Sequence, residues 1–275
     1  KNRIQFYFDN GNPTGSPLQL IDQNVLGLGL AHKNSLAFSG ETLCFVSENR
    51  GDGDTRSVYI MTSLSNVKEI GTPYINRFLA AEGTSIATCT AWMERVAGQL
   101  VYVLNLDSAE RTFVYSVDSG QWTEWQEANS TNKFPGIAAT SLNGVVYVQD
   151  AANGRVYTMP ITTFQDSAVN FTVTLQTNRL NFGVPHRKNQ TALDIIADTT
   201  TGSMSVSWSD DDYANFSTAR TNDLTRPEKR LTGLGSFYAR AYKCTYADNY
   251  ALRALAMVHE FKEDSRTQRK STTVS

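Results

Sequence analysis

The sequence predicts an all-β protein, in which β-propeller-like blades, incomplete in this chain, are followed by a C-terminal β-sandwich-like domain. The first observation is the aromatic content: 13 Phe, 12 Tyr and 4 Trp among 275 residues, which favours pleated strands over helices. The second is a rhythm of short apolar runs separated by Gly, Asn, Asp and Ser clusters, which is typical of short antiparallel strands. The third is a change beyond about residue 168 to longer, alternating strands.

The N-terminal segments "RIQFYFDNG" and "PLQLID" predict a strand pair that ends an earlier blade. The first residue is Lys1 rather than Met. We therefore expect the chain to be part of a longer product that supplies further blades, because propellers close with about four to eight of them.

Three segments each predict one blade of short antiparallel strands joined by tight turns. The apolar runs of the first are Leu36–Phe38, Leu43–Val46, Val58–Met61 and Val67–Ile70. Those of the second are Ala87–Trp92, Leu100–Leu104, Phe113–Val117 and Trp122–Trp125, and those of the third are Ile137–Thr140, Val145–Val148 and Val156–Met159.

The turn residues support this division into hairpins. Asn143-Gly144 and Asn153-Gly154 tolerate positive φ and predict two-residue hairpin turns, and Asp118–Gly120 predicts a tight turn between two strands. Trp122 and Trp125 follow that turn, and we expect both to cover the face of the blade.

Between the first two blades the sequence predicts one short helix near residues 73–81. Thr72 is a suitable N-cap and Pro73 a suitable first helical residue. The apolar side chains that we expect to share one face of this helix are Tyr74, Ile75, Phe78 and Leu79.

The predicted domains are blades over residues 1–167, a sandwich-like domain over residues 168–262 and a polar tail over residues 263–275. In the second domain, Phe171, Val173 and Leu175 alternate with polar residues, as do Met204, Val206 and Trp208. Each series predicts a strand with one buried and one solvated face.

Charge and cysteine content exclude several classes of protein. A net charge of −2 argues against a broad basic surface that grips nucleic acid through its phosphates. Cys44, Cys89 and Cys244 are far apart and odd in number, so we expect buried free thiols rather than a disulfide framework. No apolar run approaches the length of a membrane span, and no membrane anchor is predicted.

No catalytic, metal or cofactor residues are predicted. His32, His186 and His259 are widely separated and lack partners at ligand spacing. Glycoside hydrolysis requires two facing carboxylates, and no pair stands out among 27 acidic residues. The arginines that a sialidase-like site would need, Arg56, Arg95, Arg179 and Arg240, cannot be placed together from the sequence.

"SWSDDDYANFS", residues 207–217, resembles an Asp-box turn, in which an aspartate hydrogen-bonds its own hairpin. Tyr213 and Phe216 stand where that motif has Gly and Trp. Asp boxes are structural, so the motif predicts a turn rather than a catalytic site.

Taken together, several segments resemble one family. "LGLGLAHKNSLAFSGETLCFVSEN", "VYIM", "IGTPYINRFL", "QLVYVLNLDSAERTFVYSVDSGQWTEW" and "GSFYARAYKCTYAD" are similar to the packaged-DNA stabilisation and tail-hub (nozzle) proteins of short-tailed, P22-like bacteriophages. The resemblance spans roughly residues 20–260 and consists of apolar patterns rather than catalytic signatures. The diluted Asp box and the absence of the family's N-terminal part are departures from it.

The resemblance implies a virion structural protein, made in the host bacterial cytoplasm and located in the phage tail, which is not an enzyme. Copies, with six as the expected number, form a ring below the portal and adaptor proteins and continue the DNA channel. Tail fibre or tailspike and tail needle are further possible partners, and double-stranded DNA passes without sequence-specific binding. The exposed loops that we expect at these interfaces contain Arg50, Asp52, Asp54, Arg56, Asp210, Asp211 and Asp212.

Two alternatives remain open from the sequence. One is a carbohydrate-binding or sialidase-like propeller protein, which requires a cluster of arginines and carboxylates. The other is a monomeric ligand-binding propeller, which requires Trp122 and Trp125 to be exposed.

Overall fold

A computed structural model describes residues 3–49, 55–63, 66–128, 130–166 and 168–263. The chain forms two compact units, unit 1 (Lys1–Ile161) and unit 2 (Thr162–Ser275). Of the predicted polar tail, only Glu263, the last residue of the final strand, is among the described residues. Within the described part of the chain, no helix has the length and apolar content to cross a membrane.

Unit 1 begins with the predicted strand pair, which is confirmed as an antiparallel hairpin of β1 (Ile4–Asp9) and β2 (Leu18–Leu26). Large apolar side chains of this hairpin are exposed, among them Tyr7, Phe8 and Leu18.

Blade 1 is an antiparallel sheet whose first strand is interrupted. Two short strands, one before and one after a 3-10 helix, pair with the same neighbour, β5, at its two ends. Its elements are β3 (Gly29–Leu30), η1 (Lys33–Ser35), β4 (Ala37–Ser39), β5 (Thr42–Asn49), β6 (Thr55–Ser63) and β7 (Asn66–Glu69).

The predicted helix is confirmed as α1 (Pro73–Ala81), and a 3-10 helix, η2 (Gly83–Thr88), follows it. The Thr72 Oγ1 atom accepts a hydrogen bond from the Ile75 N–H and so caps the helix. Ile75 and Leu79 are buried in the core. Tyr74 is 45% exposed, but its ring contacts that of Phe78, as expected for residues on one face of the helix. Its hydroxyl donates to Glu124 on blade 2.

Blade 2 contains four consecutive antiparallel strands: β8 (Thr90–Val96), β9 (Gln99–Leu106), β10 (Arg111–Ser116) and β11 (Gln121–Trp125). Strand β8 begins three residues later than the apolar run because η2 occupies the preceding residues. Both tryptophans of β11 cover blade surfaces, as expected. Trp122 is half-buried and donates to the Ile70 carbonyl, 2.7 Å away, and Trp125 packs against Trp92.

Blade 3 is a three-stranded meander of β12 (Gly136–Leu142), β13 (Val145–Asp150) and β14 (Val156–Met159). Asn143 and Gly144 both have positive φ and form the predicted two-residue turn. The prediction of a second such turn at Asn153-Gly154 is wrong. Five residues separate β13 from β14, because the Asp150 carboxylate accepts the backbone N–H groups of the longer loop.

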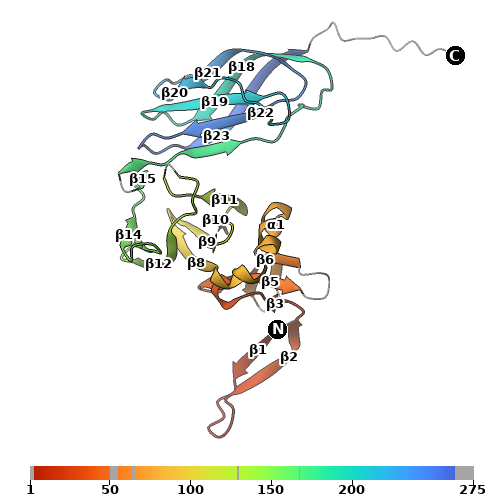
Figure 1. Ribbon diagram of the computed structural model, residues 1–275, viewed down its shortest axis with the longest axis vertical. Coiled ribbons are helices and arrows are strands. Elements are labelled where there is room, and N and C mark those ends of the chain that lie inside the picture. The colour runs from red at the N-terminus through yellow and green to blue at the C-terminus, as the bar shows by residue number, and fades with distance from the viewer. Residues whose placement is uncertain (1–2, 50–54, 64–65, 129, 167, 264–275) are drawn as a thin grey trace, which may run out of the picture. The chain divides into compact units, whose positions relative to one another are not determined.

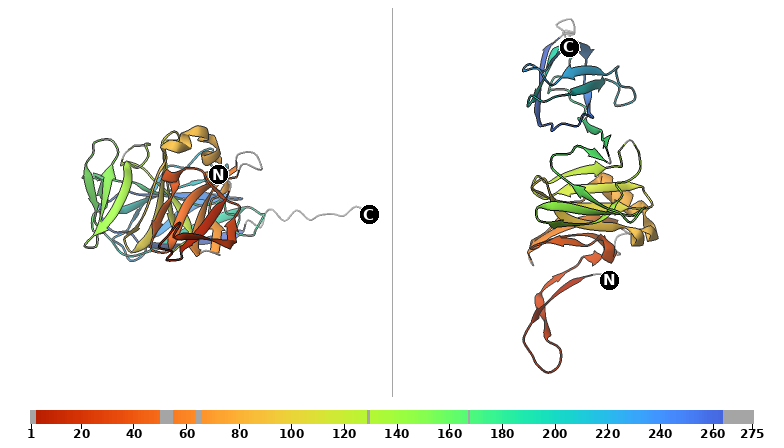
Figure 2. Two further views of the ribbon diagram at one scale, coloured as in Figure 1. Left: turned by 90° about the horizontal axis from the view of Figure 1, so that it is seen from below. Right: turned by 90° about the vertical axis from the view of Figure 1, so that its left-hand side faces the viewer.

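Blade 2 lies between blade 1 and blade 3 (Figures 1 and 2). The first strands of the blades, β4, β8 and β12, are neighbours in space, as in a propeller whose inner strands surround an axis. One apolar core fills the space between blades 1 and 2, and a smaller one lies between blades 2 and 3. The prediction of β-propeller-like blades is confirmed.

Unit 2 is a β-sandwich, which confirms the predicted second architecture. One sheet has the strand order β17-β22-β19-β20, the other has the order β21-β18-β23, and an apolar core lies between them. Its strands are β15 (Gln165–Asp166), β16 (Val169–Asn170), β17 (Val173–Gln176), β18 (Lys188–Ala197), β19 (Ser203–Ser209), β20 (Arg220–Asp223), β21 (Arg230–Phe237), β22 (Ala241–Tyr246) and β23 (Ala254–Glu263).

The two alternating patterns of this unit behave differently. Met204 and Val206 on β19 are buried, as predicted. The series Phe171, Val173 and Leu175 is exposed, with Leu175 at 57%, and this part of the prediction is wrong. Strand β17 is the edge of its sheet, so Val173 and Leu175 line an open apolar groove of about 540 Å³ instead of the closed core.

Candidate functional site

The predicted interface residues are distributed over both units. Arg50, Asp52 and Asp54 lie outside the described residues. Asp210, Asp211 and Asp212 follow β19 and are exposed, so that loop is at the surface as expected.

Arg56 does not belong to an exposed loop, which corrects the prediction. It is the second residue of β6 and is only 9% exposed. Its Nη1 atom donates to the Leu79 carbonyl at 3.1 Å, and its Nη2 atom lies 3.2 Å from the Glu48 carboxylate. The strand begins earlier than the loop prediction assumed, and α1 covers the guanidinium.

Arg56 lines a polar pocket in blade 1. The pocket has a volume of about 290 Å³ and lies where β5, β6 and β7 meet α1. We call it the blade-1 pocket and define it by its lining residues: Ser47, Thr55, Arg56, Ser57, Tyr59, Glu69 and Asn76.

The local structure explains why these side chains converge. Ser47 and Ser57 are directly opposite each other in the antiparallel β5–β6 pair, so their hydroxyls emerge on one face. Tyr59 is two residues beyond Ser57 on that same face, and its ring stacks on Phe45, with 6.0 Å between the ring centroids. Burial, together with the charge of Glu69, raises the pKa of Tyr59, so the phenol stays protonated at neutral pH.

The backbone before α1 completes the pocket. A Cβ atom at Gly71 would lie 2.2 Å from Ser57 Oγ and 2.4 Å from Asn76 Oδ1. Only glycine therefore allows this segment to pass so close to the two polar side chains. The Asn76 amide is held by a long, 3.5 Å hydrogen bond that it donates to Glu69.

Several buried polar atoms of this pocket have no hydrogen-bond partner. Within the described part of the chain, five buried side-chain atoms have no hydrogen-bond partner, and four of them line the blade-1 pocket: Ser47 Oγ, Arg56 Nε, Ser57 Oγ and Asn76 Oδ1. Buried polar groups are almost always hydrogen-bonded. Such a concentration in one cavity makes this pocket the candidate binding site of unit 1.

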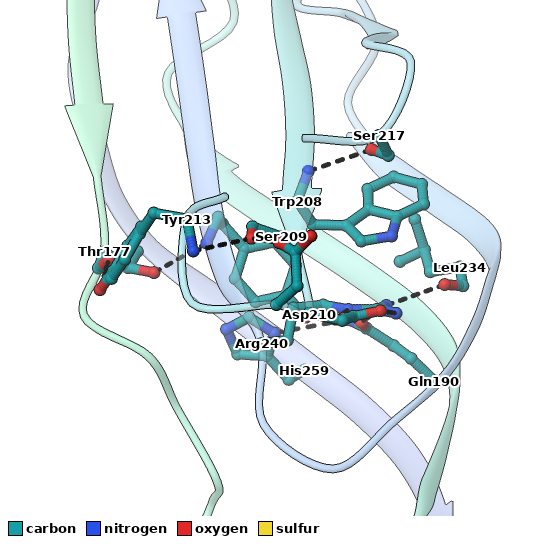
Figure 3. Close-up of polar contacts among 12 residues, drawn as sticks. Thr177, Gln190, Trp208, Ser209, Asp210, Tyr213, Ser217, Leu234, Arg240 and His259 are labelled. Atoms are coloured by element: carbon teal, nitrogen blue, oxygen red, sulfur yellow. Dashed lines mark hydrogen bonds and ion pairs between the residues drawn. The ribbon is translucent and has the colours of Figure 1, made fainter. Parts of the chain in front are cut away.

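Unit 2 contains a buried arginine whose nitrogens, unlike Nε of Arg56 in the blade-1 pocket, all have hydrogen-bond partners (Figure 3). Arg240 is 1% exposed, and its three nitrogens all have partners. Nε and Nη2 pair with the two oxygens of Asp210 at 2.7 and 2.8 Å, and Nη1 donates to Gln190 Oε1 and to the Leu234 carbonyl.

Two aromatic rings also pack against the guanidinium of Arg240. Arg240 Cζ lies 4.4 Å from the ring centroid of Phe237 and 5.2 Å from that of Trp208. The Tyr242 hydroxyl donates to Gln190 Oε1, and the Gln190 amide is 3.4 Å from Nδ1 of His259. Burial lowers the pKa of His259. Because each nitrogen of Arg240 is bonded to a group of unit 2 itself, this network stabilises the core of the sandwich.

The Asp-box-like segment forms the turn that its sequence predicts. The Asp211 carboxylate accepts hydrogen bonds from the backbone and side-chain N–H groups of Asn215 and from the Ser209 hydroxyl. These bonds lower the pKa of Asp211 to about 2. Asp212 and Tyr213 have positive φ, and the Tyr213 N–H donates to Ser209 (Figure 3).

The arginines considered for a sialidase-like site are divided between the units, with Arg56 and Arg95 in unit 1 and Arg179 and Arg240 in unit 2. Among the described residues, no three His, Cys, Asp or Glu side chains are grouped so as to hold a metal ion. The three cysteines are buried and free, as predicted.

Comparisons with known proteins give structural matches only. No protein-family model matches the sequence, and no curated protein is significantly similar to it. Solved structures that are similar to it include an exo-β-1,3-galactanase from Phanerochaete chrysosporium with galactose (9% identity, 94% of this chain, 63% of that chain, TM-score 0.23). A GH32 β-fructofuranosidase from Bombyx mori (10% identity, 92% and 89%, TM-score 0.25) and a bifunctional GH43-CE protein from Bacteroides eggerthii (8%, 84% and 60%, TM-score 0.23) are also similar.

The chain spans less than two thirds of the length of the galactanase and of the Bacteroides protein. The proteins in this comparison are glycoside hydrolases, which contradicts the prediction that the chain is not an enzyme, and that prediction is withdrawn. At these identities and TM-scores the likeness transfers no substrate and no residue role to this chain.

Proposed function

We propose that the chain is a structural component of the tail of a short-tailed bacteriophage, part of a hub or nozzle ring below the portal and adaptor proteins. In this role its copies continue the DNA channel and help to retain and deliver the genome. The apolar and aromatic patterns that resemble the tail-hub family, distributed over both units, support the proposal.

The structural observation that carries the proposal is the outer face of blade 3, which points away from blade 2. The register of β12, β13 and β14 places eight side chains on this face, and none of them is charged. Leu142 and Val156 are 61% and 62% exposed. The eight residues are Ala138, Thr140, Leu142, Val145, Tyr147, Gln149, Val156 and Thr158.

Propeller blades are stable because each packs its faces against those of its neighbours, as blade 2 does here. An exposed sheet face with large apolar side chains and no charge is typical of an interaction surface. A ring of identical copies also needs a second, different surface to receive the first. The β1–β2 hairpin, with Tyr7, Phe8 and Leu18 exposed, offers such a surface.

The charge of the chain suits a DNA conduit. Its net charge is −2, and a weakly charged channel lets DNA slide, whereas many Lys or Arg contacts to phosphates would hold it. The proposal therefore includes passage of double-stranded DNA without sequence-specific reading.

The test is assembly of the full chain with a portal–adaptor complex, followed by sedimentation. Leu142→Arg and Val156→Arg each put a charge on the outer face of blade 3. We expect either variant to remain a folded monomer that no longer sediments with the complex. Ile161→Arg is the matched control, because Ile161 is 71% exposed and lies beyond the last strand of blade 3. Normal assembly of both face variants would contradict the proposed contact.

A further inference from the structure

The blade-1 pocket carries an inference that is independent of the proposed tail role. Its three most buried side chains, Ser47, Ser57 and Arg56, are 2%, 8% and 9% exposed. Each has an atom without a hydrogen-bond partner among the described residues, and each lines the same cavity. Unpaired polar atoms at this depth are costly for folding. A solute bound in the cavity would supply the missing hydrogen-bond partners and would explain why these atoms are concentrated there.

The unpaired atoms define the hydrogen-bonding pattern of that solute. Arg56 Nε carries a hydrogen and needs an acceptor, whereas Asn76 Oδ1 is an acceptor and needs a donor. The hydroxyls of Ser47 and Ser57 can do either. The solute must therefore offer donors and acceptors within a space of about 290 Å³, which is close to the lower end of the roughly 300–1,000 Å³ of small-molecule sites.

The charges around the pocket favour a neutral solute. The positive charge of Arg56 lies beside the Glu48 carboxylate, 3.2 Å away, and Glu69 adds a further negative charge to the lining. An incoming phosphate or carboxylate would be repelled by the two glutamates. An ammonium or guanidinium cation carries only donors, so it could not accept the hydrogen bond that Arg56 Nε offers. Neutral hydroxyl groups can bond to both the donors and the acceptors that line the pocket, because each hydroxyl donates one hydrogen bond and accepts others.

We propose that the blade-1 pocket binds one neutral sugar ring of the pyranose type. A ligand hydroxyl accepts from Arg56 Nε, a second donates to Asn76 Oδ1, and the hydroxyls of Ser47 and Ser57 complete the set. The ring of Tyr59, which Phe45 holds in place, supplies an apolar wall for the C–H face of the sugar. Pockets that combine an aromatic wall with a few convergent polar groups are typical small-molecule sites.

The binding test uses the full chain and ligand-observed NMR with glucose, galactose, mannose and N-acetylglucosamine, each as the free sugar and as its methyl glycoside. We expect at least one of them to receive saturation from the protein in the millimolar range. Binding of the free sugar alone indicates a soluble monosaccharide, and binding of the methyl glycoside as well indicates the end of a glycan chain. Either result supports the pocket.

The variants Ser47→Ala and Ser57→Ala locate the binding. Each variant removes a hydroxyl that has no hydrogen-bond partner among the described residues. The melting temperature should therefore equal that of the parent chain or rise. The affinity for the sugar should fall roughly tenfold for each, the effect of one lost hydrogen bond. Ser141→Ala, an exposed serine on blade 3, is the control and should change neither quantity.

Three results would overturn the inference. The first is the absence of binding by every sugar of the panel. The second is sugar binding that both serine variants retain in full. The third is protection of the pocket from hydrogen exchange by the portal–adaptor complex without any sugar binding, since this would assign the pocket to a protein segment. The first and third leave the proposed tail role intact, so the two proposals fail separately.

Discussion

Arg240 and Asp210 form a two-pronged ion pair in which one partner is buried and the other reaches the surface. The guanidinium is 1% exposed, the carboxylate is 40% exposed, and the two nitrogen–oxygen distances are 2.7 and 2.8 Å. The pair links the loop after β19 to the core of the sandwich. It also distinguishes three consecutive aspartates, Asp210, Asp211 and Asp212, by what each carboxylate contacts.

Replacing Asp210 by Asn should destabilise unit 2 by roughly 2 kcal/mol. Breaking a fully buried pair costs about 3–5 kcal/mol, and the partial exposure of Asp210 reduces that figure, because water already solvates part of the carboxylate and weakens its pairing with Arg240. Chemical denaturation followed by the fluorescence of Trp208, whose ring lies against Arg240, measures the change.

Asp212→Asn is the control for this prediction. Its side chain is exposed, so the free energy of unfolding should change by less than about 0.5 kcal/mol. Equal losses for the two substitutions would show that the total charge of the loop, rather than the pairing with Arg240, determines the stability.

Two glycines should not tolerate a side chain. A Cβ atom at Gly71 would meet Ser57 and Asn76, and one at Gly136 would lie 2.4 Å from both Phe134 and Val148. Substituting Ala at either position should cost about 1–3 kcal/mol by overpacking. Gly27→Ala is the matched control, since no atom lies within 4 Å of its added Cβ. Thermal unfolding of the three variants measures their stability losses, which should be larger at Gly71 and Gly136 than at Gly27. A loss at Gly27 as large as at Gly71 would refute this prediction.

His259 should make the stability of unit 2 depend on pH. Burial lowers the pKa of His259 below its ordinary value of 6.5, so the unfolded chain binds a proton more readily than the folded one. The stabilisation is fully present above pH 6.5 and is lost as the pH falls below it, by at most about 1.4 kcal/mol per pH unit. Melting temperatures between pH 7.5 and 5.5, compared with those of His259→Gln, measure this loss.

The exposed His186 provides the comparison. His186→Gln should keep the decline in stability with acid, and His259→Gln should reduce it. The same decline in both variants would place its origin elsewhere in the chain.

The three cysteines should be unreactive in the folded protein. Burial raises the pKa of Cys44 to about 12 and, with the nearby charges of Asp107 and Glu82, that of Cys89 to about 12; burial also raises the pKa of Cys244. Only the thiolate reacts with a disulfide reagent. At pH 8 we expect no thiol to react in buffer and three to react in denaturant. Rapid reaction of any thiol in buffer would contradict the described packing.

Local sequence predicted the hairpins well, because turns and alternation are local properties. Asn143-Gly144 and the Thr72 cap are examples, since each acts within a few residues. The exposure of Val173 and Leu175 was not predictable, because the strand that contains them is apolar enough for a core and only its place at the sheet edge leaves it open. A strand's position in a sheet depends on distant partners.

The candidate site was harder to predict than the fold. Ser47 and Ser57 are ordinary strand residues, and their opposition across β5 and β6 follows from the register. Asn76 reaches the pocket only because α1 turns back over the blade. The single available signal was Arg56, which the sequence placed in a loop, whereas the structure buries it.

Electron microscopy of the full-length protein, alone and with a portal–adaptor complex, shows whether the chain assembles into a tail ring. We expect ring-shaped particles, or added ring-shaped density below the adaptor, with a central channel wide enough for double-stranded DNA. Compact single particles that leave the portal–adaptor complex unchanged would contradict it.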